Sequence, residues 1–192
     1  MKNNILITGF EPFNNDIINS SWEVIKRLPD SINGYKINKL LLPVKFEESS
    51  KIVIEKANKL KVKYIICVGQ AKGRKYITPE MKAINLKSDN YTSKKECNYI
   101  LSTGPKYYYS SIDVNKIYNS INNAGIKCNI SNDAGTYVCN DLFFNLLHYY
   151  NNTNIKVSFI HIPILEEQAF NNEPSIDINT GKKAIIEVIN NL

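Results

Sequence analysis

Tyr64-Ile65-Ile66-Cys67-Val68-Gly69 is the stretch that decides the fold class, because it is apolar, lacks polar alternation and ends in glycine. Strands that are buried on both faces of a parallel sheet have this pattern. Three similar runs occupy residues 5–9, 39–44 and 157–163, and residues 127–130 predict a shorter strand. We therefore predict a mostly parallel sheet.

Apolar residues at helical spacing lie between these runs. The stripes are Trp22, Ile25, Leu28; Phe46, Ser50, Val53, Ala57, Leu60; Val114, Ile117, Tyr118, Ile121; and Ala184, Ile185, Val188, Ile189, Leu192. Alternating strands and helices predict crossover units and hence a three-layer α/β/α sandwich with a mostly parallel central sheet. Residues near 82–86 and 99–102 suggest an edge hairpin.

Size and composition indicate one folded domain, residues 1–192. Hydrophobic residues make up 43% and charged residues 22% of the chain, which is close to the globular average. The net charge is +6, but the lysines are scattered and arginine occurs only at positions 27 and 74. Because nucleic-acid binders concentrate basic residues on one face, we expect no nucleic-acid partner.

The N-terminal apolar stretch, residues 5–10, is too short for a signal-peptide core or a membrane span. We therefore expect a cytoplasmic protein with no membrane association. In that compartment its four cysteines would remain thiols, and no pair of them has the C-x-x-C spacing of zinc or redox sites.

Cys139 is the candidate nucleophile. It follows Ser131-Asn132-Asp133-Ala134-Gly135-Thr136-Tyr137-Val138 and lies in the first turns of a predicted helix. Helix-start N–H groups and the helix dipole stabilise a thiolate, which can lower the cysteine pKa from about 8.5 toward neutrality. The alternative is a buried thiol that acts only as a small hydrophobe.

His161 is the candidate base for this thiol, because the chain has only one other histidine, His148. His148 lies nine residues after Cys139 on the same predicted helix, about 180° around and about 13 Å along it. His161 lies near the carboxyl end of a predicted strand, from which it can reach a neighbouring loop. Either histidine could instead be a hydrogen-bonded core residue, and we expect that role for His148.

Glu80 is the candidate acid. It ends a long loop that follows residues 64–69, and a carboxylate there can accept the second imidazole N–H and orient the base. The alternative is a solvated glutamate at a helix start after Pro79. Phe10 and Phe13 bracket a turn after the first strand, where they either line an apolar pocket or cap the core.

Together these segments resemble the pyroglutamyl peptidase I family of cysteine peptidases, which remove an N-terminal pyroglutamate. The resemblance covers nearly the whole chain. Its motifs are Thr8-Gly9-Phe10-Glu11-Pro12-Phe13, Asn19-Ser20-Ser21-Trp22, Val68-Gly69-Gln70-Ala71, Gly73-Arg74, Ile77-Thr78-Pro79-Glu80, Ala83-Ile84-Asn85, Ser131-Asn132, Ala134-Gly135-Thr136-Tyr137-Val138-Cys139-Asn140, Phe159-Ile160-His161-Ile162-Pro163 and Glu167-Gln168.

The resemblance implies a hydrolase without metal or cofactor, in which Cys139 is the nucleophile, His161 the base and Glu80 the orienting acid. It also implies a set of substrate-binding residues, namely Phe10, Phe13, Asn19, Gln70, Tyr137 and Val138. By similarity, the two phenylalanines sandwich the pyrrolidone ring, and backbone groups around Gln70 and Val138 bind the polar groups of its lactam. The implied partners are peptides with an N-terminal pyroglutamate and further copies of the chain in a homodimer or homotetramer.

The chain departs from the family pattern at two positions. Met81 and Asn90 stand where the family usually has arginine, and the surrounding residues 87–93 differ from its usual sequence. The first hypothesis is a pyroglutamyl-cleaving cysteine exopeptidase. The alternative is a catalytically weak or inactive homologue that binds pyroglutamyl or related small ligands, and turnover of a pyroglutamyl anilide distinguishes the two.

Overall fold

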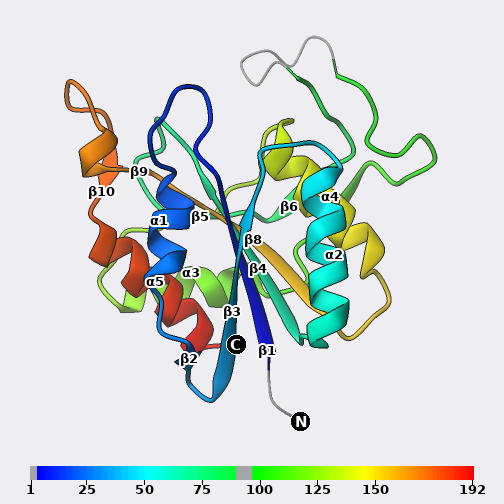
Figure 1. Ribbon diagram of the computed structural model, residues 1–192, viewed down its shortest axis with the longest axis horizontal. Helices are drawn as coiled ribbons and strands as arrows, with labels where there is room; N and C mark the ends of the chain where they lie inside the picture. The colour runs from blue at the N-terminus through cyan, green and yellow to red at the C-terminus, as the bar shows by residue number, and fades with distance from the viewer. Residues whose placement is uncertain (1–3, 90–96) are drawn as a thin grey trace.

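A six-stranded sheet lies at the centre of the molecule, as traced in a computed structural model that describes residues 4–89 and 97–192 (Figure 1). In spatial order the strands are β2 (Ser31–Ile32), β3 (Tyr35–Leu42), β1 (Asn4–Phe10), β4 (Tyr64–Gln70), β8 (Lys156–Ile162) and β5 (Thr78–Pro79). Strands β3, β1, β4 and β8 are parallel, whereas β2 and β5 run antiparallel at the two edges. The predicted mostly parallel sheet is confirmed.

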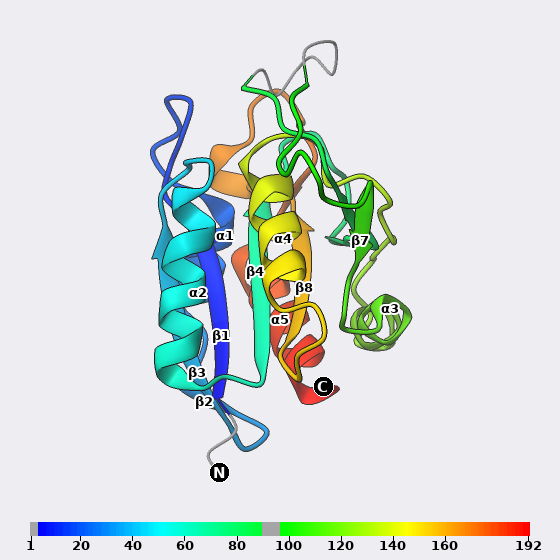
Figure 2. The same cartoon turned by 90° about the vertical axis from the view of Figure 1, so that its right-hand side faces the viewer.

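Helices cover both faces of this sheet (Figure 2). The helices are α1 (Ser20–Lys26), α2 (Glu48–Leu60), α3 (Val114–Asn123), α4 (Val138–Tyr149) and α5 (Ile178–Asn190). Helices α1, α3 and α5 bury residues such as Ile25 and Ile185 on one face, and α2 and α4 bury Val53 and Phe143 on the other. This arrangement confirms the α/β/α sandwich. None of the helices in the described part of the chain has the length and apolar character needed to cross a membrane.

Three short polar residues cap helix starts in this fold. The side chains of Asn19, Asp113 and Asp177 accept backbone N–H groups of the first turns of α1, α3 and α5. The predicted stripe residue Phe46 lies just before α2, because the backbone turns sharply at Glu47, where φ is 60°.

Strand register brings the carboxyl ends of the parallel strands to one edge of the sheet. His161 of β8 pairs with Gly69 of β4 on one side and with Thr78 of β5 on the other. Phe10 ends β1 and Gln70 ends β4 at the same edge. Residues far apart in the sequence therefore meet there, as expected of a parallel sheet.

The predicted edge hairpin is present only as one isolated antiparallel bridge, between Lys87 and Asn98, just beyond the predicted segments. Strand β6 (Lys82–Ile84) pairs with β7 (Tyr107–Tyr109), and the two form a separate two-stranded sheet. The segment predicted to pair with β6 is held by a side chain instead, because Asn85 Nδ2 donates to the Leu101 carbonyl at 2.8 Å and Asn85 Oδ1 accepts the Leu101 N–H at 2.9 Å. A further small sheet joins β9 (Ile164–Leu165) to β10 (Ser175–Ile176). The 3₁₀ turn Glu166–Gln168 and a loop connect the two strands.

The short strand predicted at residues 127–130 is also absent from the described chain. In its place, Cys128 makes an isolated bridge with Ile77, and Ser131 makes another with Glu80. These single contacts fix the loop that leads into α4 against the segment that carries Glu80.

Candidate active site

A cavity of about 460 Å³ opens at the carboxyl edge of the sheet. It collects residues from β1, β4, β8, the start of α4 and the loops that join them. The lining residues are Phe10, Phe13, Asn14, Asp16, Asn19, Val44, Gln70, Ala71, Lys72, Ala134, Tyr137, Val138, Cys139 and His161. Every residue predicted for the site lines this cavity except Glu80, which lies behind His161.

Cys139 is the second residue of α4 and is half-buried, with its side chain on the cavity wall. The helix start is fixed by the neighbouring Asn140, which is fully buried. Asn140 Oδ1 accepts the Ile84 N–H at 2.9 Å, and Nδ2 donates to the Ile84 and Leu86 carbonyls. The first-turn amides beside Cys139 have no partner inside the helix and can therefore donate to a ligand.

His161 is bonded to the predicted acid. Its Nδ1 lies 2.7 Å from Oε1 of Glu80, a carboxylate with no exposed surface. Glu80 is held by the backbone on both sides, since its N–H donates to the Phe159 carbonyl and the Met81 N–H donates to the Ser131 carbonyl. It belongs to an extended segment, so the alternative of a solvated glutamate at a helix start does not apply.

The charges of this pair are set by burial and by close contacts. Burial alone would raise the pKa of Glu80, but the hydrogen bond to His161 and the charge of Arg74 hold the pKa below its ordinary range. Burial lowers the pKa of His161 more than the Glu80 carboxylate raises it. At neutral pH the pair is therefore an anionic carboxylate beside a neutral imidazole, whose Nδ1 carries the shared proton.

The structure corrects the expectation of a low pKa for Cys139. Burial, together with the negative charge of Glu80, raises the pKa of this thiol to about 12. Loss of solvent around the sulfur is the largest cause of this shift. At neutral pH Cys139 therefore carries its proton, and a base has to remove that proton when the sulfur attacks.

Phe10 and Phe13 form the aromatic side of the cavity. Phe10 is buried at the end of β1 and Phe13 is half-buried in the loop that follows. Asn19 anchors this loop, because its Nδ2 donates to the Glu11 carbonyl at 3.0 Å and its Oδ1 accepts the Ser21 hydroxyl at 2.7 Å. Both readings of the phenylalanines thus hold in part, since Phe10 belongs to the core as well as to the cavity.

Both polar atoms of the Gln70 side chain are hydrogen-bonded to protein groups. Its Oε1 accepts the Ser20 N–H at 2.8 Å and Nε2 of Gln168 at 2.9 Å, while its Nε2 donates to Asp16 Oδ2 at 2.8 Å. Gln168 also donates to the Ile18 carbonyl, which ties the two rim loops together. We did not predict Asp16 as a site residue. Gln168 appears in the sequence analysis only as part of the family motif Glu167-Gln168, and this motif is the sequence signal that could identify it.

The residues that precede the nucleophile also line the cavity. Tyr137 is the N-cap residue of α4, and its ring packs edge-on against Phe46 at 5.4 Å between centroids. Val138 is buried beside it. Phe46 has no recognisable motif of its own, so only the folded chain reveals that it supports this part of the lining.

The remaining histidine and thiols lie outside the cavity. His148 is exposed, with its Nδ1 2.9 Å from the Tyr108 hydroxyl, so the expectation of a core histidine is wrong. It lies near the far end of α4, where the last turn reaches solvent. Cys67 and Cys128 are buried, and burial raises the pKa of each to about 12.

The two departures from the family pattern differ in what the structure shows. Met81 is half-buried and its carbonyl accepts the Ser110 N–H at 2.9 Å. Asn90 lies outside the described residues.

Fold and site together define a class of protein. A thiol at a helix start and an imidazole backed by a buried carboxylate share one cavity above a parallel sheet, which is the arrangement of a cysteine hydrolase. The chain belongs to the pyroglutamyl peptidase family, whose model matches residues 3–191. Its members are cysteine peptidases, and this protein is an enzyme of that kind.

Individual relatives agree with this assignment. The chain is 40% identical to the pyrrolidone-carboxylate peptidases of Vibrio parahaemolyticus and Thermosipho africanus, over 96% and 95% of this chain and 92% and 93% of theirs. The crystal structure of pyroglutamyl peptidase I from Bacillus amyloliquefaciens superposes with a TM-score of 0.91 at 34% identity, covering 100% of this chain and 95% of that one. The pyrrolidone carboxyl peptidase from Thermococcus litoralis gives 0.89 at 28% identity, covering 97% and 91%.

Proposed function

We propose that this enzyme removes the N-terminal pyroglutamyl residue from peptides by covalent catalysis through Cys139, His161 and Glu80. The observation that carries the proposal is the 2.7 Å contact between His161 and buried Glu80 at the edge of a cavity that Cys139 also lines. A buried carboxylate that accepts from Nδ1 fixes the imidazole tautomer and leaves Nε2 as the proton acceptor.

The first half-reaction forms a thioester. The Cys139 sulfur attacks the carbonyl carbon that links pyroglutamate to the next residue, and the thiol proton moves to Nε2 of His161. First-turn N–H groups of α4 stabilise the negative oxygen of the tetrahedral intermediate. The imidazolium returns the proton to the leaving amine as the C–N bond breaks.

The second half-reaction restores the enzyme. A water molecule gives a proton to His161 and attacks the thioester carbon, and the sulfur then leaves and recovers its proton. Glu80 stays ionised throughout and stabilises the imidazolium each time it forms. Because the resting thiol is protonated, general-base assistance is required in the attack step.

The cavity suits a neutral, flat ring. Phe10 and Phe13 contribute aromatic surface to its lining, and Val138 contributes apolar surface. The Gln70 side chain is committed to protein partners, so backbone groups near Gln70 and Val138 are left to bind the lactam N–H and C=O. Tyr137 and Asn19 hold the walls in place.

The test is turnover of a chromogenic pyroglutamyl anilide by the purified protein, with and without prior alkylation by iodoacetamide. We expect release of the aniline and its loss after alkylation. Stable release in the alkylated enzyme, or none in the untreated one, would contradict the proposal.

A second candidate is favoured by Met81 and Asn90, which replace two family arginines. If either family arginine serves as an oxyanion donor, its absence from this chain costs about 3 kcal/mol of transition-state stabilisation. The chain would then bind pyroglutamyl ligands with little turnover. Calorimetric binding of free pyroglutamate without hydrolysis of the anilide would favour this candidate.

Three further properties stay predictions: a single catalytic domain, a cytoplasmic location, and assembly into a homodimer or homotetramer. Sedimentation of the purified protein would test the last of these.

A further inference from the structure

The guanidinium of Arg74 converges on the same carboxylate oxygen as the site imidazole. Arg74 lies in the loop between β4 and β5, and its Nη1 is 2.6 Å from Oε1 of Glu80. His161 Nδ1 contacts that oxygen at 2.7 Å. One oxygen atom therefore receives hydrogen bonds from both a permanent cation and the imidazole.

The same side chain reaches the loop that leads to the nucleophile. Arg74 Nη2 donates to the Asp133 carbonyl at 2.9 Å, and Nη1 also contacts the Thr78 hydroxyl. Asp133 in turn accepts the Gly135 N–H on its carboxylate, which shapes the loop before α4. Arg74 thus connects Glu80 on one segment to the approach to Cys139 on another.

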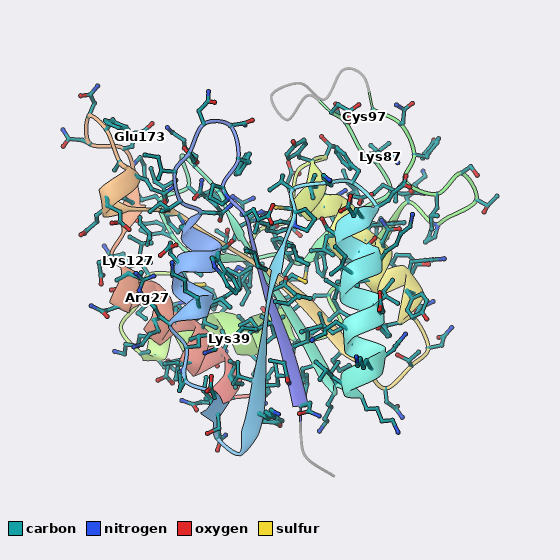
Figure 3. The ribbon with its side chains drawn as sticks, viewed as in Figure 1. Arg27, Lys39, Lys87, Cys97, Lys127 and Glu173 are labelled. Atoms are coloured by element: carbon teal, nitrogen blue, oxygen red, sulfur yellow. The ribbon has the colours of Figure 1, made fainter. Side chains whose placement is uncertain are left out.

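An ordinary surface ion pair does not have these properties. The only other arginine in the sequence, Arg27, pairs with Glu23 on α1 and leaves 45% of its side chain exposed. It lies at the carboxyl end of α1, away from the loops at the upper edge of the sheet (Figure 3). Arg74 is 27% exposed and its partner carboxylate is completely buried. Loss of Arg74 would leave the buried Glu80 carboxylate without a permanent cation and be costly, whereas Glu23 would keep its ion pair with Lys26 if Arg27 were lost.

We propose that Arg74 is a positioning residue of the catalytic site, which holds Glu80 as an oriented anion behind His161 and fixes the loop that delivers Cys139. The inference rests on the proposed function and extends it to a residue that does not line the cavity.

Three charged groups act on the protonation of His161, each from a different segment. Glu80 follows β5 and Asp133 precedes α4, and their negative charges favour the imidazolium. Arg74 opposes it, in the same direction as burial, and Cys139, which lines the same cavity, is a neutral thiol. Removing the guanidinium should therefore raise the pKa of His161 and shift the acid limb of the rate profile to higher pH.

The experiment compares Arg74→Met with Arg74→Lys, and uses Arg27→Met as the matched control. The titration of the imidazole C–H signals by NMR needs no turnover, and His148→Gln assigns the two histidines. We expect Arg74→Met to move the His161 midpoint about one pH unit higher. Arg74→Lys should stay near the wild-type midpoint, and Arg27→Met should match the wild type.

Activity supplies the second readout. We expect kcat of Arg74→Met to fall about 100-fold at pH 7 with KM changed less than about threefold, because the catalytic groups are misplaced while the binding walls stay. Arg74→Lys keeps the charge but cannot donate hydrogen bonds to Glu80 and to the Asp133 carbonyl at the same time. It should therefore recover only part of kcat.

The outcomes separate the two proposals. A His161 midpoint that is unchanged or lower in Arg74→Met overturns the role of Arg74, whatever the wild type does with substrate. If Arg74→Met does not fold, a wild-type kcat in Arg74→Lys overturns the proposal that the guanidinium positions Glu80 and the loop before Cys139. A wild-type protein that hydrolyses no pyroglutamyl anilide refutes the proposed function, while the titration still decides on Arg74.

Discussion

A side-chain carbon added at Gly69 would lie 3.0 Å from the sulfur of Cys139. The same carbon would come within 2.9 Å of the Phe159 ring, so the space above the end of β4 is already filled. Gly69 is also the register partner of His161. The position of the nucleophile therefore depends on the absence of a side chain on the neighbouring strand.

Gly69→Ala should displace the thiol or the Phe159 ring. We expect kcat/KM to fall at least about 10-fold, since small displacements of reacting groups are costly. Overpacking should also lower stability by about 1–3 kcal/mol. Gly34→Ala is the control, because it strains a turn with φ of 77° far from the cavity and should destabilise the fold without changing kcat/KM. Wild-type kinetics in Gly69→Ala would contradict the packing argument.

Replacing the thiols one at a time distinguishes the nucleophile from structural cysteines. Cys139→Ala should abolish hydrolysis of a pyroglutamyl anilide, because no covalent intermediate can form. Cys67→Ala, which removes a buried sulfur from the middle of β4, should lower the melting temperature and keep turnover. Steady-state assays and thermal melts of both variants provide the measurement. Wild-type turnover in Cys139→Ala would refute the assignment.

The two histidines should behave oppositely. His161→Ala removes the general base and should lower kcat at least about 100-fold. His148→Ala removes only an exposed contact with Tyr108 and should leave the kinetics unchanged. An inactive His148→Ala beside an active His161→Ala would show that the base is misassigned.

Specificity should follow from the apolar aromatic surface that Phe10 and Phe13 contribute to the cavity. A prolyl substrate lacks the ring carbonyl and carries a charged amine, so it would leave buried polar groups unpaired and bring a charge beside Phe10 and Phe13. We expect kcat/KM for matched prolyl substrates to be at least about 10⁴-fold below that for pyroglutamyl substrates. Phe13→Ala should reduce the pyroglutamyl value. Comparable hydrolysis of both substrates by the wild type, or no loss in Phe13→Ala, would rule out this pocket.

The pH dependence follows from the direction of the His161 pKa shift. The neutral imidazole is the base and burial lowers its pKa, so kcat/KM should rise through an apparent pKa below the ordinary value of 6.5 and then level off. Below pH 6.5 the unfolded chain binds a proton at this histidine that the folded chain resists. The free energy of unfolding should therefore fall as the pH drops through that range.

The thiol gives an independent check. In His161→Ala, which lacks base assistance, iodoacetamide alkylation of Cys139 should accelerate with pH and show no plateau below about pH 10, because the thiol pKa is about 12. Peptide mass spectrometry identifies the alkylated residue. A plateau near pH 7 would mean that the helix start does lower the pKa.

The sequence alone determined the layered fold and the choice of candidate groups. Unbroken apolar runs such as residues 64–69 predict buried parallel strands, and helical stripes between them predict the covering layers. Helical geometry excluded His148, and the family motifs named Glu80. These signals are local, or depend on spacing along one element, and so they can be recognised in the sequence without the folded structure.

Only the tertiary structure decided the features that depend on distant contacts. The pairing of β6 with β7, the raised pKa of Cys139 and the shared oxygen of Glu80 all arise between segments that are far apart in the sequence. A periodic pattern gives the face on which a side chain lies but not its partner, its solvent exposure or the charges around it. Those quantities are set when the chain folds, because desolvation and Coulomb energies depend on distances in space.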